Sequence, residues 1–131
     1  MNHWLIKSEP SAFSIDDMQQ SHIEPWNGVR NYQARNFMKA MQLGDLCFFY
    51  HSNNKNPGIV GLVRVVKQFY ADPDDPRFVC VDVEYLQHTN LLSLQHLKSM
   101  PALSHLPLFQ QSRLSVQPVD SPAAAVLLNM I

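Results

Sequence analysis

The sequence predicts an α+β fold, a small open β-barrel with mostly antiparallel strands and helices at its ends. Three stretches, residues 46–51, 58–69 and 77–87, have the length and the apolar or alternating character of strands. They follow one another through short turns, with few signals of parallel crossovers. Because 131 residues suffice for one core and not for two, we expect a single domain over residues 1–131.

The first elements are a strand and a short helix. Residues 3–7 form a β-prone run that ends at Ser8-Glu9-Pro10, where proline cannot continue a central ladder. Ser14 followed by Asp17 is typical of a capped helix start. We therefore expect a helix over about residues 15–20.

A second helix and a buried strand follow. Asn31 can cap a helix in which residues 34, 37, 38 and 41 are apolar and repeat at i, i+3, i+4 and i+7. That spacing places one apolar stripe against the core. After a turn at residues 43–45, the continuous apolar run 46–51 predicts a strand buried on both faces.

The remaining elements are predicted from alternation and turn residues. Residues 58–69 are rich in valine, and Gly61 within them indicates a bend or bulge. Residues 72–76 form a turn before the alternating strand 77–87. The last elements expected are a helix over 94–100 capped by Ser93, an irregular segment over 102–109, a strand over 113–119, and a helix over 123–130 started by Ser121 and Pro122. The predicted order is β-α-α-β-β-β-α-β-α.

Composition and charge exclude several classes of protein. Ten Lys and Arg residues against eleven Asp and Glu give a net charge of −1, which argues against a protein that coats long nucleic acid. The apolar runs are too short to span a membrane, and the N-terminus lacks signal-peptide character. We expect a cytoplasmic protein, or a nuclear one in a eukaryote. Cys47 and Cys80 lie in apolar runs and are expected to be buried, reduced thiols.

Candidate catalytic and metal-ligating patterns fail on spacing. Cys47 and His51 are four residues apart on a predicted strand, roughly 13 Å at about 3.3 Å per residue, too far for a nucleophile and base. The six histidines show no zinc spacing. The four glycines form no phosphate-binding loop, and Gly58 to Gly61 is better interpreted as strand than as a GXXG clamp. We expect no enzyme, cofactor or metal.

Residues 25–35 combine the aromatic plane of Trp26, two guanidinium groups and three side-chain amides without core periodicity. Trp26 flanked by amides and Arg30 is suited to stack on a planar base while polar groups read its edge. The alternative is that Trp26 is a half-buried core residue and that Arg30 and Arg35 are solvated helix charges. Both readings are compatible with this stretch on its own.

Six motifs in order resemble the EVE domain family over nearly the whole chain. They are residues 4–10 (WLIKSEP), 26–36 (WNGVRNYQARN), 44–46 (GDL), 49–53 (FYHSN), 58–61 (GIVG) and 113–118 (RLSVQP). The family has a PUA-like fold and is related to YTH domains, which hold a methylated adenine in an aromatic cage. The resemblance implies recognition of a modified, methylated base in DNA or RNA.

The resemblance also implies a set of site residues, with Trp26 as one wall of the pocket. Relatives carry Asn-Pro-Arg-Trp where this chain has residues 75–78, so Phe78 would be a smaller second wall. The junction over residues 70–76 is also shorter than in relatives. The expected ligand-binding residues are Lys7, Ser8, Trp26, Asn27, Arg30, Asn31, His51, Ser52, Phe78, Ser115 and Gln117.

The leading hypothesis is therefore a non-enzymatic, nucleic-acid-binding reader of a modified base. Three alternatives stay open: a small-metabolite sensor, a protein-interaction module, and an accessory to an RNA-modifying enzyme. The sequence leaves open which base is modified, whether the partner is DNA or RNA, and the oligomeric state.

Overall fold

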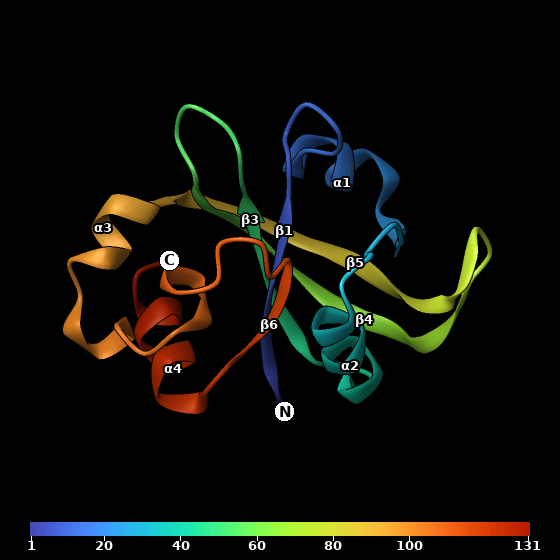
Figure 1. Ribbon diagram of the computed structural model, residues 1–131. Helices are drawn as coiled ribbons and strands as arrows, with labels where there is room; N and C mark the ends of the chain where they lie inside the picture. Colours follow the sequence, from blue (N-terminus) through green and yellow to red (C-terminus); the bar gives the residue numbers. More distant parts are fainter.

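One mixed sheet organises the protein. The computed structural model describes residues 1–131 and contains a six-stranded sheet in the order β2-β5-β4-β3-β1-β6 (Figure 1). The elements are β1 (His3–Ser8), α1 (Ile15–Ser21), β2 (Ile23–Trp26), α2 (Tyr32–Ala40), β3 (Leu46–His51), β4 (Gly58–Asp72), β5 (Asp75–Ser93), α3 (Leu94–Lys98), the 3-10 turns Pro101–Leu103 and Pro107–Phe109, β6 (Val116–Val119) and α4 (Ser121–Asn129).

Neighbouring strands are antiparallel except for β1 and β3, which run parallel. The predicted α+β class and mostly antiparallel sheet are confirmed. The parallel pair arises because α1, β2 and α2 form the crossover between β1 and β3. No pairing joins the edge strands β2 and β6, so the sheet does not close into a barrel.

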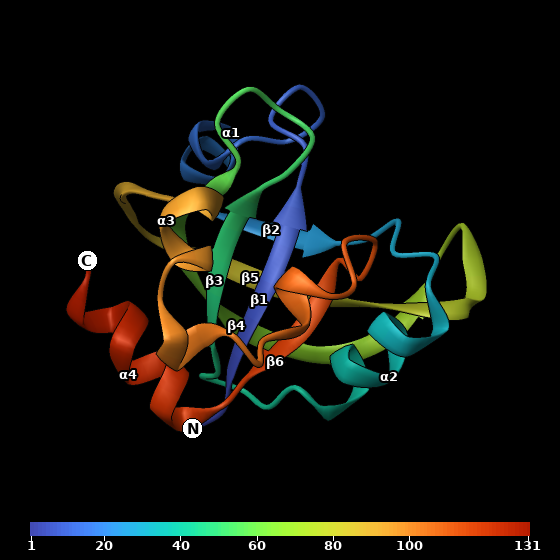
Figure 2. The same ribbon diagram turned by 60° about the vertical axis from the view of Figure 1, so that its left-hand side comes forward.

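The sheet buries side chains on both faces. In β3, Cys47 and Phe49 belong to the core beneath α1 and α2, whereas Phe48 and Tyr50 belong to the core beneath α3 and α4. Figures 1 and 2 show the two helix pairs at opposite sides of the sheet. The prediction that this strand is buried on both faces is confirmed.

Strand β2 was not predicted, and its residues explain why. It is four residues long and contains Pro25, which has no N–H to donate to a ladder. Proline is tolerated because β2 is an edge strand that pairs only with β5. Of the four residues, Trp26 alone is buried, so no alternation could reveal the strand.

Several boundaries also differ from the prediction. β5 continues to Ser93 because its polar residues keep pairing with β4 through the backbone, as His88 does opposite Gly61. β6 begins only at Val116, after a turn closed by Leu114 N–H donating to Gln111 O. Asp120, not Ser121, caps α4, because its carboxylate accepts from the Ala123 N–H.

The predicted helix caps and bulge are confirmed. Ser14 and Asp17 form a reciprocal capping box at α1, and Asn31 Oδ1 accepts from the Ala34 N–H at 2.8 Å. The pairing of β4 shifts by one residue next to Gly61, where Val60 is the extra residue. A Cβ at Gly61 would collide with Ile15, so glycine lets α1 lie directly on the sheet.

A buried carboxylate fixes the N-terminal strand to the turn before β3. Asp45 is 2% exposed and accepts hydrogen bonds from Trp4 Nε1 at 2.9 Å, Gln42 N–H at 2.9 Å and Asn2 N–H at 3.1 Å. These bonds join the N-terminal segment to the turn that contains Gln42 and Asp45. None of the helices is both long and apolar enough to cross a membrane.

Replacing Asp45 with alanine should lower the free energy of unfolding by about 1–3 kcal/mol, because the buried Trp4 indole N–H loses its acceptor. Urea denaturation measures this loss. Asp74→Ala removes an exposed carboxylate that accepts no hydrogen bond and is the matched control. Equal destabilisation by the two substitutions would contradict the role of Asp45.

Candidate functional site

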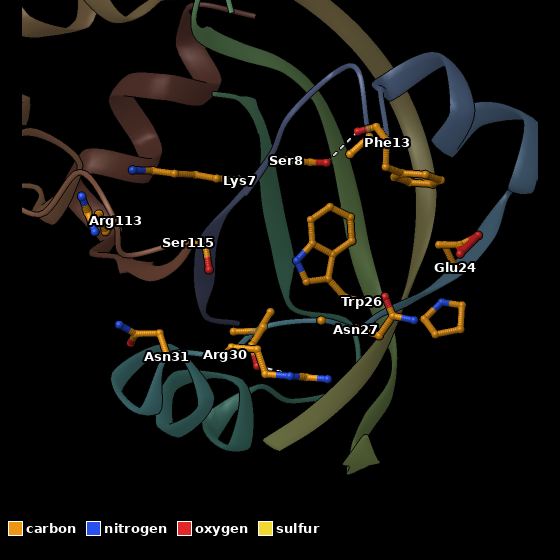
Figure 3. A pocket seen from close by; sticks show the side chains of 14 residues that line it. Lys7, Ser8, Phe13, Glu24, Trp26, Asn27, Arg30, Asn31, Arg113 and Ser115 are labelled. Atoms are coloured by element: carbon orange, nitrogen blue, oxygen red, sulfur yellow. Dashed lines mark hydrogen bonds between the residues drawn. The ribbon is translucent and has the colours of Figure 1, made fainter. Parts of the chain in front are cut away.

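A cavity of about 700 Å³ opens on the side of the sheet that carries α1 and α2 (Figure 3). Four segments far apart in sequence build it: the end of β1 with the following turn, β2, the loop from β2 to α2, and the residues before β6. Its lining residues are Lys7, Ser8, Ala12, Phe13, Glu24, Pro25, Trp26, Asn27, Gly28, Val29, Arg30, Asn31, Arg113 and Ser115.

Trp26 belongs both to the core and to this cavity. Its ring packs edge-on against Phe49, with centroids 5.4 Å apart, and against Phe13, with centroids 6.2 Å apart. The residue is only 7% exposed, yet Figure 3 shows its indole nitrogen turned into the cavity on the side of Ser115. The indole N–H has no acceptor within the protein, unlike that of Trp4. An unused donor therefore faces the cavity from an aromatic ring that is packed into the core.

The polar side chains around Trp26 differ in how far the fold uses them. Asn27 and Ser115 make no side-chain hydrogen bond within the protein, so both are available to a ligand. Asn31 uses its oxygen to cap α2 and keeps its amide N–H groups free. Ser8 donates to Phe13 O at 2.7 Å, which fixes the turn that carries the Phe13 ring (Figure 3).

Seven of the eleven residues expected from the sequence line the cavity: Lys7, Ser8, Trp26, Asn27, Arg30, Asn31 and Ser115. The other four lie elsewhere. Gln117 is fully buried and donates to Leu114 O. Ser52 lines an adjoining groove.

His51 and Phe78 serve contacts of the fold. His51 Nε2 accepts from the Ile15 N–H at 3.1 Å, and burial lowers the pKa of this histidine, which favours the neutral acceptor. Phe78 stacks on Tyr32 with centroids 5.0 Å apart, and the Arg30 guanidinium lies 5.2 Å from its ring centre. The second aromatic at the cavity is therefore Phe13, where the sequence had suggested Phe78.

Sequence reasoning missed the contribution of the turn after β1 and of Arg113. The one signal for Phe13 is its place directly before the helix cap Ser14, where an apolar residue commonly folds back over the first helical turn. Arg113 lies close to the cavity only because the segment before β6 passes the end of β1, where Lys7 N–H donates to Ser115 O. That juxtaposition has no local sequence signal.

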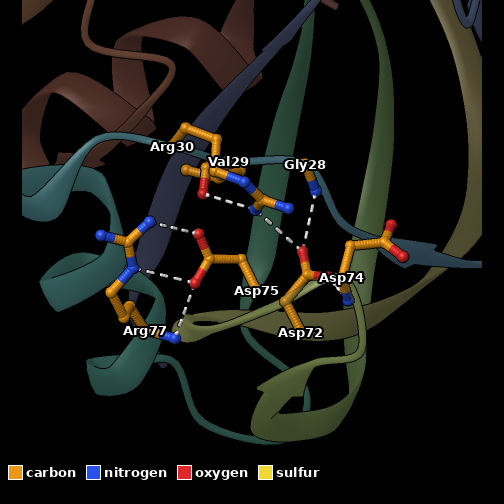
Figure 4. A network of polar contacts seen from close by, with 7 residues as sticks. All are labelled: Gly28, Val29, Arg30, Asp72, Asp74, Asp75 and Arg77. Atoms are coloured by element: carbon orange, nitrogen blue, oxygen red, sulfur yellow. Dashed lines mark hydrogen bonds and ion pairs between the residues drawn. The ribbon is translucent and has the colours of Figure 1, made fainter.

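A buried carboxylate at the tip of the β4–β5 hairpin holds the loop from β2 to α2 (Figure 4). Asp72 is 1% exposed and accepts from Gly28 N–H at 3.1 Å, from Arg30 at 3.0 Å and from Asp74 N–H at 2.9 Å. Gly28 has φ +75°, a left-handed conformation that L side chains rarely adopt. The hairpin thus fixes the wall of the cavity from outside.

The same contacts set the electrostatics of this wall. Hydrogen bonds from Asp74 N–H and Arg30 lower the pKa of Asp72 to about 2, so the carboxylate stays ionised. Since Arg30 is paired with Asp72, its charge is largely compensated. Next to this pair, Arg77 pairs with Asp75 at 2.8 Å (Figure 4).

Neither cysteine has the environment of a reactive thiol. Cys47 is fully buried, and burial raises the pKa of its thiol far above the usual range. Burial also raises the pKa of Cys80 to about 11. The sequence-based expectation of buried, reduced thiols is confirmed.

The chain is similar to proteins of a known family. The model of the family described as EVE domain matches residues 2–130. Human thymocyte nuclear protein 1 is 39% identical over 165 aligned positions, which cover 98% of this chain and 73% of the relative. The alignment exceeds the 131 residues of this chain by 34 positions, so the relative has segments that are absent here.

Solved structures agree closely with this fold. A hypothetical protein from Leishmania major superposes with a TM-score of 0.95 and 42% identity, covering 99% of this chain and 94% of that one. Human THYN1 protein, solved in complex with 5-methylcytosine containing DNA, superposes with a TM-score of 0.93 and 36% identity, covering 98% and 96%.

Replacing Asp72 with asparagine should lower the free energy of unfolding at pH 7 by about 1–3 kcal/mol, because a buried, charge-assisted network loses its anion. The pKa of Asp72 is lower in the folded than in the unfolded protein, so its stabilisation is present above about pH 4 and is lost as the pH falls toward 2. Urea denaturation at several pH values should show wild type and variant converging in acid.

Asp74→Asn is the control for Asp72→Asn, because the exposed Asp74 side chain accepts no hydrogen bond. Its stability should match that of the wild type at every pH. A gap between the wild type and Asp72→Asn that stays constant from pH 7 to pH 2 would contradict the account.

Proposed function

Because the chain belongs to the EVE domain family, we propose that it is a single nucleic-acid-binding domain, residues 1–131, that reads a modified base in the Trp26 cavity. The observation that carries this proposal is the unused indole N–H of a fixed aromatic ring facing a cavity with free amide and hydroxyl groups. The volume of about 700 Å³ is within the ordinary range for small-ligand sites.

We propose 5-methylcytosine as the base to be read. The complex of human THYN1 with DNA containing this base supports the choice, since that structure is 36% identical in sequence to this chain. A base inside a duplex is hidden by its neighbours, so the target nucleotide has to be extruded or single-stranded to enter the cavity.

Apolar groups of the cavity would contact the ring and methyl group of the base, and polar groups would bind its edge. Trp26, Phe13 and Val29 offer apolar surface to a ring and its methyl group. Burying one methyl contributes on the order of 0.8 kcal/mol, which is modest selectivity. The polar edge adds to it, because an unpaired buried group costs about 1–3 kcal/mol.

Donors and acceptors in the cavity are compatible with a cytosine edge. The Trp26 indole N–H and the free amide N–H groups of Asn31 can donate to ring acceptors. The Glu24 carboxylate and the Asn27 side-chain oxygen can accept from an exocyclic amino group. A base with the opposite pattern would leave several of these groups unpaired.

We propose that the domain binds without catalysing a reaction. The candidate nucleophile Cys47 is buried with a raised pKa, and the imidazole of His51 accepts from the Ile15 N–H. Neither residue lines the cavity. The groups around Trp26 are therefore suited to hold a base and not to attack it.

Trp26→Phe should weaken binding of a single-stranded DNA containing 5-methylcytosine by about 1–3 kcal/mol, because stacking area and the indole N–H are lost while an aromatic core residue remains. Fluorescence anisotropy of a labelled oligonucleotide measures the affinity. Trp4→Phe is the matched control, since it perturbs the core without touching the cavity. Equal losses for the two variants would show that only stability had changed.

Asn27→Ala tests edge reading without a change in stability. The side chain is exposed and makes no hydrogen bond within the protein, so the free energy of unfolding should change by less than about 0.5 kcal/mol. The ratio of affinities for 5-methylcytosine and for other modified bases in the same oligonucleotide should fall. An unchanged ratio would show that Asn27 does not contribute to recognition of the modified base.

A further inference from the structure

We infer that a polar groove beside the base cavity binds the backbone phosphates that flank the extruded nucleotide, an inference that rests on the proposed function. The groove has a volume of about 540 Å³, and none of its eight lining residues is hydrophobic. It shares Lys7, Ser8, Arg113 and Ser115 with the base cavity. The two sites therefore adjoin, and one extended ligand can occupy both.

Backbone hydrogen bonds fix the groove. The end of β1 lies between the loop after β3 and the segment before β6. Ser52 N–H donates to Ser8 O at 3.0 Å on one side, and Lys7 N–H donates to Ser115 O at 2.9 Å on the other. Because all three segments are joined at this point, the backbone positions that carry the hydroxyl groups and cations are fixed relative to one another.

Two cations of the groove are not paired with carboxylates. Lys7 Nζ donates to Ser112 O at 3.1 Å, which uses one of its three N–H groups. Arg113 is exposed and forms no ion pair. Figure 3 shows both side chains at the same edge of the cavity. Arg30, by contrast, is bound to Asp72.

The groove also contains one carboxylate, that of Glu9, whose negative charge offsets one of the two positive charges. Glu9 accepts from Asn53 Nδ2 at 2.6 Å, which links the turn after β1 to the loop after β3. Burial lowers the pKa of Lys7, so its ammonium group gains from an anion that replaces lost water. Cations, hydroxyl groups and the lack of an apolar wall together suit a phosphodiester better than a base or an apolar side chain.

Two cations limit how many phosphates the groove can neutralise. Each phosphate contact on a single strand contributes about 0.7 to the slope of log affinity against log salt, so two contacts give a slope of about −1.4. This weak salt dependence is compatible with a chain of net charge −1.

Ser52→Asp is the direct test, because Ser52 lines the groove and not the base cavity. The added negative charge should weaken binding of a single-stranded oligonucleotide at least about tenfold, equally for 5-methylcytosine and for cytosine. Arg113→Gln, a change at an exposed residue, should lower the salt slope by about 0.7. Asn129→Asp places the same charge on α4, outside the groove, and should leave affinity unchanged.

An oligonucleotide with neutral methylphosphonate linkages on both sides of the modified base identifies the phosphates concerned. On this ligand the effects of Ser52→Asp and Arg113→Gln should disappear. Undiminished effects on the neutral ligand, or full affinity of both variants for the charged one, would overturn the inference. Failure of the proposed function has a different signature: a wild-type affinity ratio of 1 between modified and unmodified oligonucleotides.

Discussion

The packing of Trp26 is the constraint on which the candidate site depends. Its ring is held edge-on against Phe49 of the central strand β3 and against Phe13, so the core fixes the indole before any ligand arrives. A ring that is already ordered loses little side-chain entropy on binding. The cost of this arrangement is that the residue serves stability and recognition together, and only substitutions that keep an aromatic ring can separate the two roles.

A charged residue outside the cavity, Asp72, fixes the wall that lies next to Trp26. Asp72, at the tip of a long hairpin, holds Gly28 and Arg30 and thereby the loop between Trp26 and α2. The hairpin turn itself consists of only two residues, 73 and 74. A chain with a longer segment here could place additional groups near the base cavity, whereas this chain relies on the buried carboxylate.

Local signals predicted most of the fold. The caps at Ser14 and Asn31, the apolar stripe of α2 and the continuous apolar run of β3 each depend on neighbours within a few residues, and each was confirmed. Strand β2 was not predicted, because Pro25 and a single buried residue leave no periodic pattern. The positions of Phe13 and Phe78 depended on contacts between distant segments, which periodicity does not encode.

The two indole N–H groups offer the most direct test of base reading. That of Trp4 is bound to Asp45 inside the protein, whereas that of Trp26 faces the cavity without an acceptor. In a ¹H–¹⁵N NMR titration with a single-stranded oligonucleotide containing 5-methylcytosine, the Trp26 indole resonance should shift strongly and the Trp4 resonance should not. The unmodified oligonucleotide should produce a smaller shift at the same concentration. A Trp26 resonance that stays fixed, or that responds equally to both oligonucleotides, would contradict recognition of a modified base in this cavity.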